Sequence, residues 1–287
     1  MKVVLSRKGY DATSGGVASP IFPDGALCSL PIPDRGPRLG DIRHGESSLG
    51  LIVEQLTGKP GLADSSAHLD PDLDAHARPR QTGWRPCFGQ VGAAQSHLSN
   101  QRVGEGDLFL FFGWFRKVEL AGGRLSYRPQ APDLHCLFGW LQVGRIYHLS
   151  APGVEPPPWA AEHPHVQFAS HYGSATSNNT LYVAAERLRL PGIRRQIDGG
   201  GVFGQYTRCL QLTEPGRPRS TWRLPSCFNP REGAAPLSYH ANPTRWGRDD
   251  GDVLLRSVAR GQEFVLDCDY YPGVIEWLSE VFGAAST

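Results

Sequence analysis

The segment from His68 to His76 holds two imidazoles and three carboxylates on alternate positions. In an extended chain, alternate side chains point to the same face, so all five polar groups would face one way. Mixed histidine and aspartate ligands suit a hard or borderline divalent metal such as Fe(II), Mn(II) or Zn(II). The pattern therefore indicates a metal site, with a solvated acidic loop as the alternative interpretation.

Only part of this segment is expected to reach a metal. Pro71 stiffens the chain after Asp70, so the later aspartates should diverge from His68 and Asp70. We therefore predict that His68 and Asp70 are the metal ligands. Two ligands do not make a site, so the remaining ligands must come from a distant histidine or acid, such as His97 or Asp24.

A second candidate site is the loop from Ser6 to Gly16, which leaves the end of a predicted strand. Its two cations, its hydroxyls and its glycines, together with free backbone N–H groups, suit a phosphate or a carboxylate. Ser6, Arg7 and Lys8 are the candidate ligand-binding residues. The alternative is an ordinary polar turn in which an aspartate accepts hydrogen bonds from the backbone.

Amide and imidazole side chains gather in the stretch from Gly89 to Gln101. Gln95, His97 and Asn100 offer groups that can recognise the edge of a nucleobase. The alternative is a helix whose polar face is simply exposed to solvent. Two further histidines, His163 and His165, form a second metal candidate, but a His-Pro-His sequence in a proline-rich loop is typical of plain surface.

Two apolar stretches must position these groups. Residues 103–116 and 134–147 each have the pattern of a buried strand entered from a polar turn, and together they predict two sides of a small β-barrel for a flat, partly polar ligand. Four of their side chains are expected in the core: Phe109, Phe111, Trp140 and Val143. Around them we predict a strand at residues 2–6, helices within 47–57 and 90–101, a strand pair formed by 253–258 and 263–268, and a closing amphipathic helix over 271–285.

The predicted fold class is α+β, rich in strands, with a PUA-like β-barrel segment and a few short helices. The 34 glycines and 24 prolines favour short elements and many turns. We expect a single compact domain over residues 1–287, with the barrel-like core at about 86–190. The proline-rich stretch at 151–162 is a candidate internal linker.

Composition narrows the function classes. The net charge of +1 provides no global attraction to polyanions, so contact with nucleic acid would depend on a local patch. Six cysteines without zinc-ligand spacing suit a reducing compartment, and neither a signal peptide nor a membrane segment is expected. We therefore expect a cytoplasmic protein, and no protein partner can be inferred. The sequence contains no P-loop, HExxH, GxSxG or CxxC motif.

Several motifs resemble the nucleotide modification associated domain 3 family, across nearly the whole chain. They are Leu5–Asp11, Pro20–Gly25, Ser29–Asp34, His68–Asp72, Phe88–Leu98 and Gly106–Phe115. The resemblance implies a role near modified nucleotides without fixing a reaction. Separately, Gly106–Phe111 followed by Gly139–Gly144 is similar to the core of PUA-like, ASCH and EVE barrels, which bind bases or modified bases.

Three functions remain open. In the first, the protein is an enzyme of nucleotide or nucleic-acid base modification. The segment of residues 6–8 holds phosphate, and Asp11, Asp24 and His97 orient the substrate or act as acid and base. The amide side chains of Gln95 and Asn100 recognise the base. In the second, it recognises a modified base without converting it. In the third, it is a metal-dependent enzyme, such as an Fe(II) oxygenase, that uses His68 and Asp70. Metal analysis separates the third from the first two.

Overall fold

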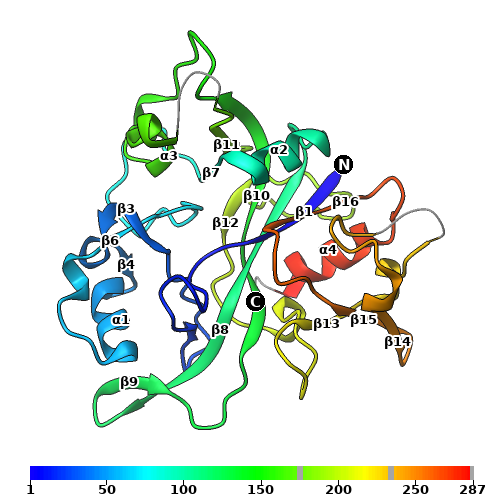
Figure 1. The fold of residues 1–287 in the computed structure, drawn as a ribbon, viewed down its shortest axis with the longest axis horizontal. Helices are drawn as coiled ribbons and strands as arrows, with labels where there is room; N and C mark the ends of the chain where they lie inside the picture. The colour runs from blue at the N-terminus through cyan, green and yellow to red at the C-terminus, as the bar shows by residue number, and fades with distance from the viewer. Residues whose placement is uncertain (173–176, 232–235, 285–287) are drawn as a thin grey trace.

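Two long antiparallel strands, β8 (Leu108–Ala121) and β10 (Leu134–His148), run through the middle of the molecule (Figure 1). The computed structural model describes residues 1–172, 177–231 and 236–284. Continuous apolar runs suit strands that are covered on both faces. Phe109, Phe111 and Val143 are buried, as predicted, whereas Trp140 is only half-buried and donates a hydrogen bond from its indole N–H to the Asp198 carbonyl.

Within the described residues, nine strands form one sheet around this pair. The strand order is β16 (Glu263–Asp267), β1 (Lys2–Arg7), β8, β10, β11 (Thr180–Ala184) and β7 (Cys87–Gln90), with β12 (Gly200–Val202) beside β10, and β2 (Ser19–Ile21) and β9 (Arg124–Tyr127) beside β8. Strands β1 and β8 are parallel, while β16 and β10 run antiparallel to them. The strand-rich α+β prediction is confirmed.

The ends of this strand order meet through side chains rather than through the backbone. The Gln90 amide at the end of β7 donates to the Glu263 carboxylate at the start of β16, at 2.7 Å. Lys8, just beyond β1, donates to the same oxygen at 2.9 Å. Since no backbone pairing joins β7 to β16 among the strands described, the sheet is curled but is not a closed barrel.

Smaller sheets flank this core. They are β3 (Pro33–Arg38) with β6 (Ser66–Ala67), β4 (Arg43–His44) with β5 (Ser47–Ser48), and β13 (Thr221–Leu224) with β15 (Asp252–Arg256) and β14 (Trp246–Asp249). The predicted pairing of 253–258 with 263–268 is wrong. Strand β15 pairs with β13 and β14, while β16 pairs with β1, because the intervening loop turns away to bond Arg7 through the carbonyls of Val258 and Ala259.

Helices are few and short, as predicted. They are α1 (Leu49–Thr57), α2 (Gly92–Asn100), α3 (Pro164–Gln167) and α4 (Val274–Ala284), with 3₁₀ turns η1 (Leu39–Asp41), η2 (Leu62–Asp64), η3 (Pro158–Ala160), η4 (Ala169–Tyr172), η5 (Arg208–Leu210), η6 (Ser226–Phe228) and η7 (Pro243–Arg245). The Ser48 hydroxyl caps α1 by accepting from the Leu51 N–H, and Gly58 ends the helix with a left-handed residue.

The closing helix predicted over residues 271–285 is α4, and Ala285 lies outside the described residues. Figure 1 shows α4 beside β16 and the β13–β15–β14 sheet, on the opposite side of β8 from α1. None of the helices in the described part of the chain combines the length and the apolar character that crossing a membrane requires.

Candidate functional site

A cleft of about 690 Å³ opens where the loop after β1 meets the segment after β6. The start of β3, residues of α3 and η4, and two short stretches around Arg219 and Ala259 also contribute to its walls. This volume falls within the range of small-molecule sites in proteins. Two of the sequence-predicted groups, the Ser6–Gly16 loop and the His68–Asp70 pair, therefore contribute side chains to one cavity.

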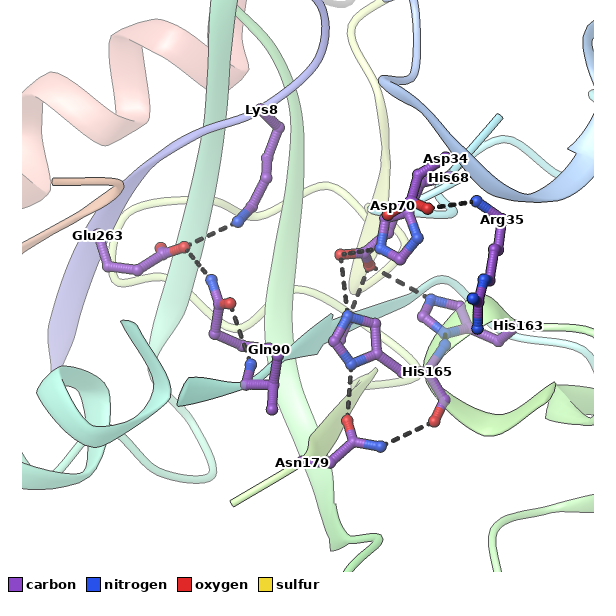
Figure 2. A network of polar contacts seen from close by, with 12 residues as sticks. Lys8, Asp34, Arg35, His68, Asp70, Gln90, His163, His165, Asn179 and Glu263 are labelled. Atoms are coloured by element: carbon purple, nitrogen blue, oxygen red, sulfur yellow. Dashed lines mark hydrogen bonds and ion pairs between the residues drawn. The ribbon is translucent and has the colours of Figure 1, made fainter. Parts of the chain in front are cut away.

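Three imidazoles surround the Asp70 carboxylate at one wall of the cleft (Figure 2). His68 Nε2 and His165 Nε2 each lie 3.8 Å from Asp70 Oδ2, and His163 Nε2 lies 3.3 Å from Asp70 Oδ1. The ligand atoms of His68, Asp70 and His165 all lie within 4.8 Å of one another. Two imidazoles and one carboxylate on one side of an open cavity is the ligand set of many non-haem Fe(II) sites.

Segments far apart in the sequence build this cluster. His68 follows β6 directly, and its backbone N–H donates to the Ile32 carbonyl, which ties it to the chain entering β3. The Gly89 N–H in β7 donates to Asp70 Oδ1 at 2.7 Å and orients the carboxylate. His165 lies in the first turn of α3. The cluster therefore depends on the packing of α3, and of the segment that follows β6, against β7.

Asn179 sets the tautomer of His165. Asn179 Oδ1 lies 2.6 Å from His165 Nδ1, and Asn179 Nδ2 donates to the His165 carbonyl at 2.8 Å. Since a carboxamide oxygen only accepts, His165 Nδ1 carries the proton and Nε2 is left with its lone pair towards Asp70. Metal-ligating histidines commonly donate their second ring nitrogen to an oxygen in this way.

Burial controls the charge states in the cluster. Burial lowers the pKa of His165 to about 4 and also lowers the pKa of His68, so both rings are neutral near pH 7, as metal ligands must be. Burial alone would raise the pKa of the Asp70 carboxyl, but its contact with His163, whose ring is protonated near pH 7, holds this pKa well below its usual range. The site thus presents one carboxylate and two neutral imidazoles.

His163 faces away from the cleft. Although burial opposes protonation, Cys87 and the Asp70 carboxylate raise the pKa of His163 to about 10. His163 lines a second cavity, of about 230 Å³. There the Asp72 carboxylate accepts two hydrogen bonds from the Arg80 guanidinium, at 2.6 and 2.7 Å, so Asp72 diverges from Asp70. Since His163 and His165 are buried, their interpretation as plain surface is wrong.

The cations of the Ser6–Gly16 loop are engaged within the protein. Arg7 lines the cleft and donates to the Val258 and Ala259 carbonyls, each at 2.7 Å. Lys8 also lines the cleft but forms a buried ion pair with Glu263. Asp11 Oδ1 accepts three hydrogen bonds, from the Thr13 N–H and hydroxyl and from the Ser14 N–H, so it organises the loop as an aspartate turn.

The other sequence-predicted residues lie elsewhere. Ser6 is buried within β1, and Asp24 is exposed in a turn where it accepts from the Ala26 N–H. Gln95 is buried in α2 and accepts from the Tyr182 hydroxyl at 3.0 Å. His97 bonds the Ser238 hydroxyl at 2.9 Å, and Asn100 is exposed at the end of α2. These five residues are not among those that line the cleft.

The sequence-based assignment lacked several residues of the site. Asn179 and Gly89 bond members of the cluster of His68, Asp70 and His165, whereas Trp114 and Arg219 line the cleft. Asn179 had a readable signal, since a carboxamide precedes a strand and follows the His-Pro-His sequence. Arg219 had none, because it lies in an irregular, arginine-rich region where nothing distinguishes one arginine from the next.

Comparison with protein families gives one match. Residues 2–267 match the model of a family described as nucleotide modification associated domain 3. No curated protein and no solved structure matches the chain significantly.

Proposed function

Because the chain belongs to the nucleotide modification associated domain 3 family, we propose that it is a metal-dependent enzyme that modifies a nucleotide or a nucleobase. The metal is a divalent ion such as Fe(II), held by His68, Asp70 and His165. The substrate is a free nucleotide or a nucleotide within nucleic acid, bound in the adjoining cleft. The six free cysteines suit a reducing compartment, so the proposed location is the cytoplasm.

One observation carries the proposal: the two-histidine, one-carboxylate group lines the same cleft as the loop after β1. A metal held by these three groups would lie at the wall of the cleft, where it could supply Lewis-acid or redox chemistry to a bound substrate. His165 has its Nδ1 proton committed to Asn179, and both metal-facing histidines are neutral. The donor set fits Fe(II), and it also fits Zn(II) or Mn(II).

The protein groups have separable roles in this proposal. His68, Asp70 and His165 hold the metal. Such an ion either activates a bound water or, as iron, carries out redox chemistry. His163 is a positioning residue, because it contacts the second oxygen of Asp70 from outside the cleft. The Ser6–Gly16 loop forms part of the substrate wall.

Elemental analysis and metal titration test the proposal. Wild type is expected to bind one equivalent of Fe(II), Mn(II) or Zn(II), and the variants His68→Ala, Asp70→Ala and His165→Ala are expected to lose it. His76→Ala is the matched control, because His76 belongs to the same histidine-rich segment but is exposed. His97→Ala should also keep the metal, since His97 bonds Ser238.

Activity is tested with the metal-loaded protein and nucleosides recovered from nucleotides, DNA and RNA. A mass change that depends on the metal and on His165 supports an enzyme. If wild type binds no divalent metal, the metal-dependent enzyme is excluded, and a module that only binds a modified base becomes the better interpretation.

A further inference from the structure

We propose that Arg219, stacked on Trp114, is the residue that binds a phosphate group of the substrate. The inference rests on the proposed function for the identity of the substrate as a nucleotide. It assigns phosphate binding to a residue outside the Ser6–Gly16 loop. The loop cations then shape the cleft and its charge without being the direct anion ligands.

Among the lysine and arginine side chains that line the cleft, that of Arg219 is available to a ligand. Of the cations that line the cleft, Arg7 donates to two backbone carbonyls and Lys8 is paired with Glu263. The Arg219 guanidinium makes no hydrogen bond or ion pair with any residue in the described ranges. It therefore keeps its donors for a ligand. A guanidinium presents a rigid fork of donors that matches the oxygens of a phosphate.

The Arg219 side chain is held in place before a ligand binds. The Arg219 guanidinium lies 4.3 Å from the ring centroid of Trp114. The Trp114 indole N–H donates to Asp133 Oδ1 at 2.9 Å, which fixes the ring. The Thr213 hydroxyl donates to the Arg219 carbonyl at 2.8 Å, which fixes the backbone. An arginine held in this way loses less conformational entropy when it binds an anion than a free surface arginine does.

A neutral histidine, His135, and a second cation, Arg7, line the cleft together with Arg219. Trp222 Nε1 donates to His135 Nδ1 at 3.0 Å, so the ring proton of neutral His135 lies on Nε2. Burial, together with the positive charges of Arg7 and Arg219, lowers the pKa of His135 to about 3. His135 lines the cleft and supplies a neutral donor beside two cations. Asp11 also lines the cleft; although burial opposes its ionisation, the hydrogen bonds of its own turn and the charge of Arg219 lower its pKa.

Binding measurements test the assignment. The probes are inorganic phosphate, each common nucleoside, its 5′-monophosphate and short single-stranded oligonucleotides, all measured by calorimetry at low salt. Wild type is expected to bind at least one monophosphate about tenfold or more tightly than the matching nucleoside. Arg219→Ala should remove this preference. Arg217→Ala is the matched control, because Arg217 is exposed and lies outside the cleft lining.

Each result of these binding measurements either identifies the source of the phosphate or overturns the assignment. Preference for a monophosphate over oligonucleotides identifies a free nucleotide as the source of the phosphate, and the reverse identifies a nucleic-acid strand. An Arg219→Ala variant that keeps the preference overturns the assignment, as does an equal loss in Arg217→Ala or the absence of phosphate-dependent binding in wild type. His165→Ala distinguishes this inference from the proposed function, because it should lose metal while it keeps the preference for phosphate.

Discussion

Gly89 leaves the space that His165 occupies. A Cβ atom added to Gly89 would lie 2.2 Å from Cδ2 and from Cγ of the His165 imidazole, far inside any real contact. Gly89 is also the residue whose N–H donates to Asp70 Oδ1. One backbone position in β7 therefore orients the carboxylate and admits the imidazole, so the geometry of the cluster depends on a residue that is not itself a ligand.

Gly89→Ala is expected to abolish metal binding although all ligands remain. The methyl group must displace the His165 ring, which moves Nε2 away from Asp70. Metal titration measures the effect, and Gly104→Ala serves as the control because its added Cβ would meet no atom within 4 Å. The stability loss of Gly89→Ala should shrink in a His165→Ala background. Equal losses in both backgrounds would contradict the steric explanation.

Asn179→Ala is expected to weaken metal affinity by about 10- to 100-fold, the usual effect of losing an outer-sphere partner. His165 would lose the acceptor that keeps its proton on Nδ1 and its ring in place. Competition with a chelator measures the affinity. Asn100→Ala, at an exposed position of α2, should leave affinity unchanged. Unchanged affinity in Asn179→Ala would show that His165 is held by packing alone.

Phe111→Ala is expected to destabilise the protein by about 3–5 kcal/mol, as large-to-small core substitutions of Phe do. The ring is fully buried in β8, where it packs against Phe88 and Phe109. Urea denaturation measures the free energy of unfolding. Leu120→Ala is the matched control on the same strand, because Leu120 is 68% exposed, and it should cost less than about 0.5 kcal/mol.

Acid should destabilise the protein through His240, which is fully buried. His240 Nδ1 donates to the Ser238 carbonyl, and Nε2 accepts from the Val258 N–H at 3.2 Å, so the folded state requires a neutral ring. Burial, with smaller contributions from Arg245 and Arg7, lowers the pKa of His240 to about 4. The unfolded histidine titrates near 6.5, so between these values the unfolded state binds more protons and stability falls as pH falls.

The contribution of one such histidine to the slope reaches at most about 1.4 kcal/mol per pH unit. Urea denaturation at pH 7.5 and at pH 5 measures it. His240→Gln should be less stable than wild type at pH 7.5 but should lose less stability on acidification. A His240→Gln slope equal to that of wild type would assign the acid sensitivity to other groups.

Local patterns predicted the elements better than their partners. The apolar stretches gave β8 and β10 as neighbouring strands, because continuous burial leaves a direct signal in composition. The predicted pairing of 253–258 with 263–268 is wrong. The prediction rested on the adjacency of the two segments in sequence, whereas in the structure hydrogen bonds from Arg7 hold the loop between them away from a hairpin.

The same limit applies to the site. His68 and Asp70 are close in sequence and could be proposed as a pair, but their companion His165 reaches them only after β7 and α3 have packed together. Charge alone also misleads about Arg7 and Lys8. Whether a cation is available to a ligand depends on acceptors that lie about 250 residues away, as the separation of 255 between Lys8 and Glu263 illustrates.

The two ends of the curled sheet, β7 and β16, are joined by side chains and not by backbone pairing. In a barrel closed by backbone pairing, several peptide hydrogen bonds join the first and last strands, so no single side-chain substitution removes the closure. Here the seam between β7 and β16 relies on the Glu263 carboxylate, which receives the Gln90 amide and the Lys8 ammonium. Both donors also line the cleft. Within the described residues, one buried carboxylate therefore bonds two side chains that line the cleft and connects both ends of the strand order.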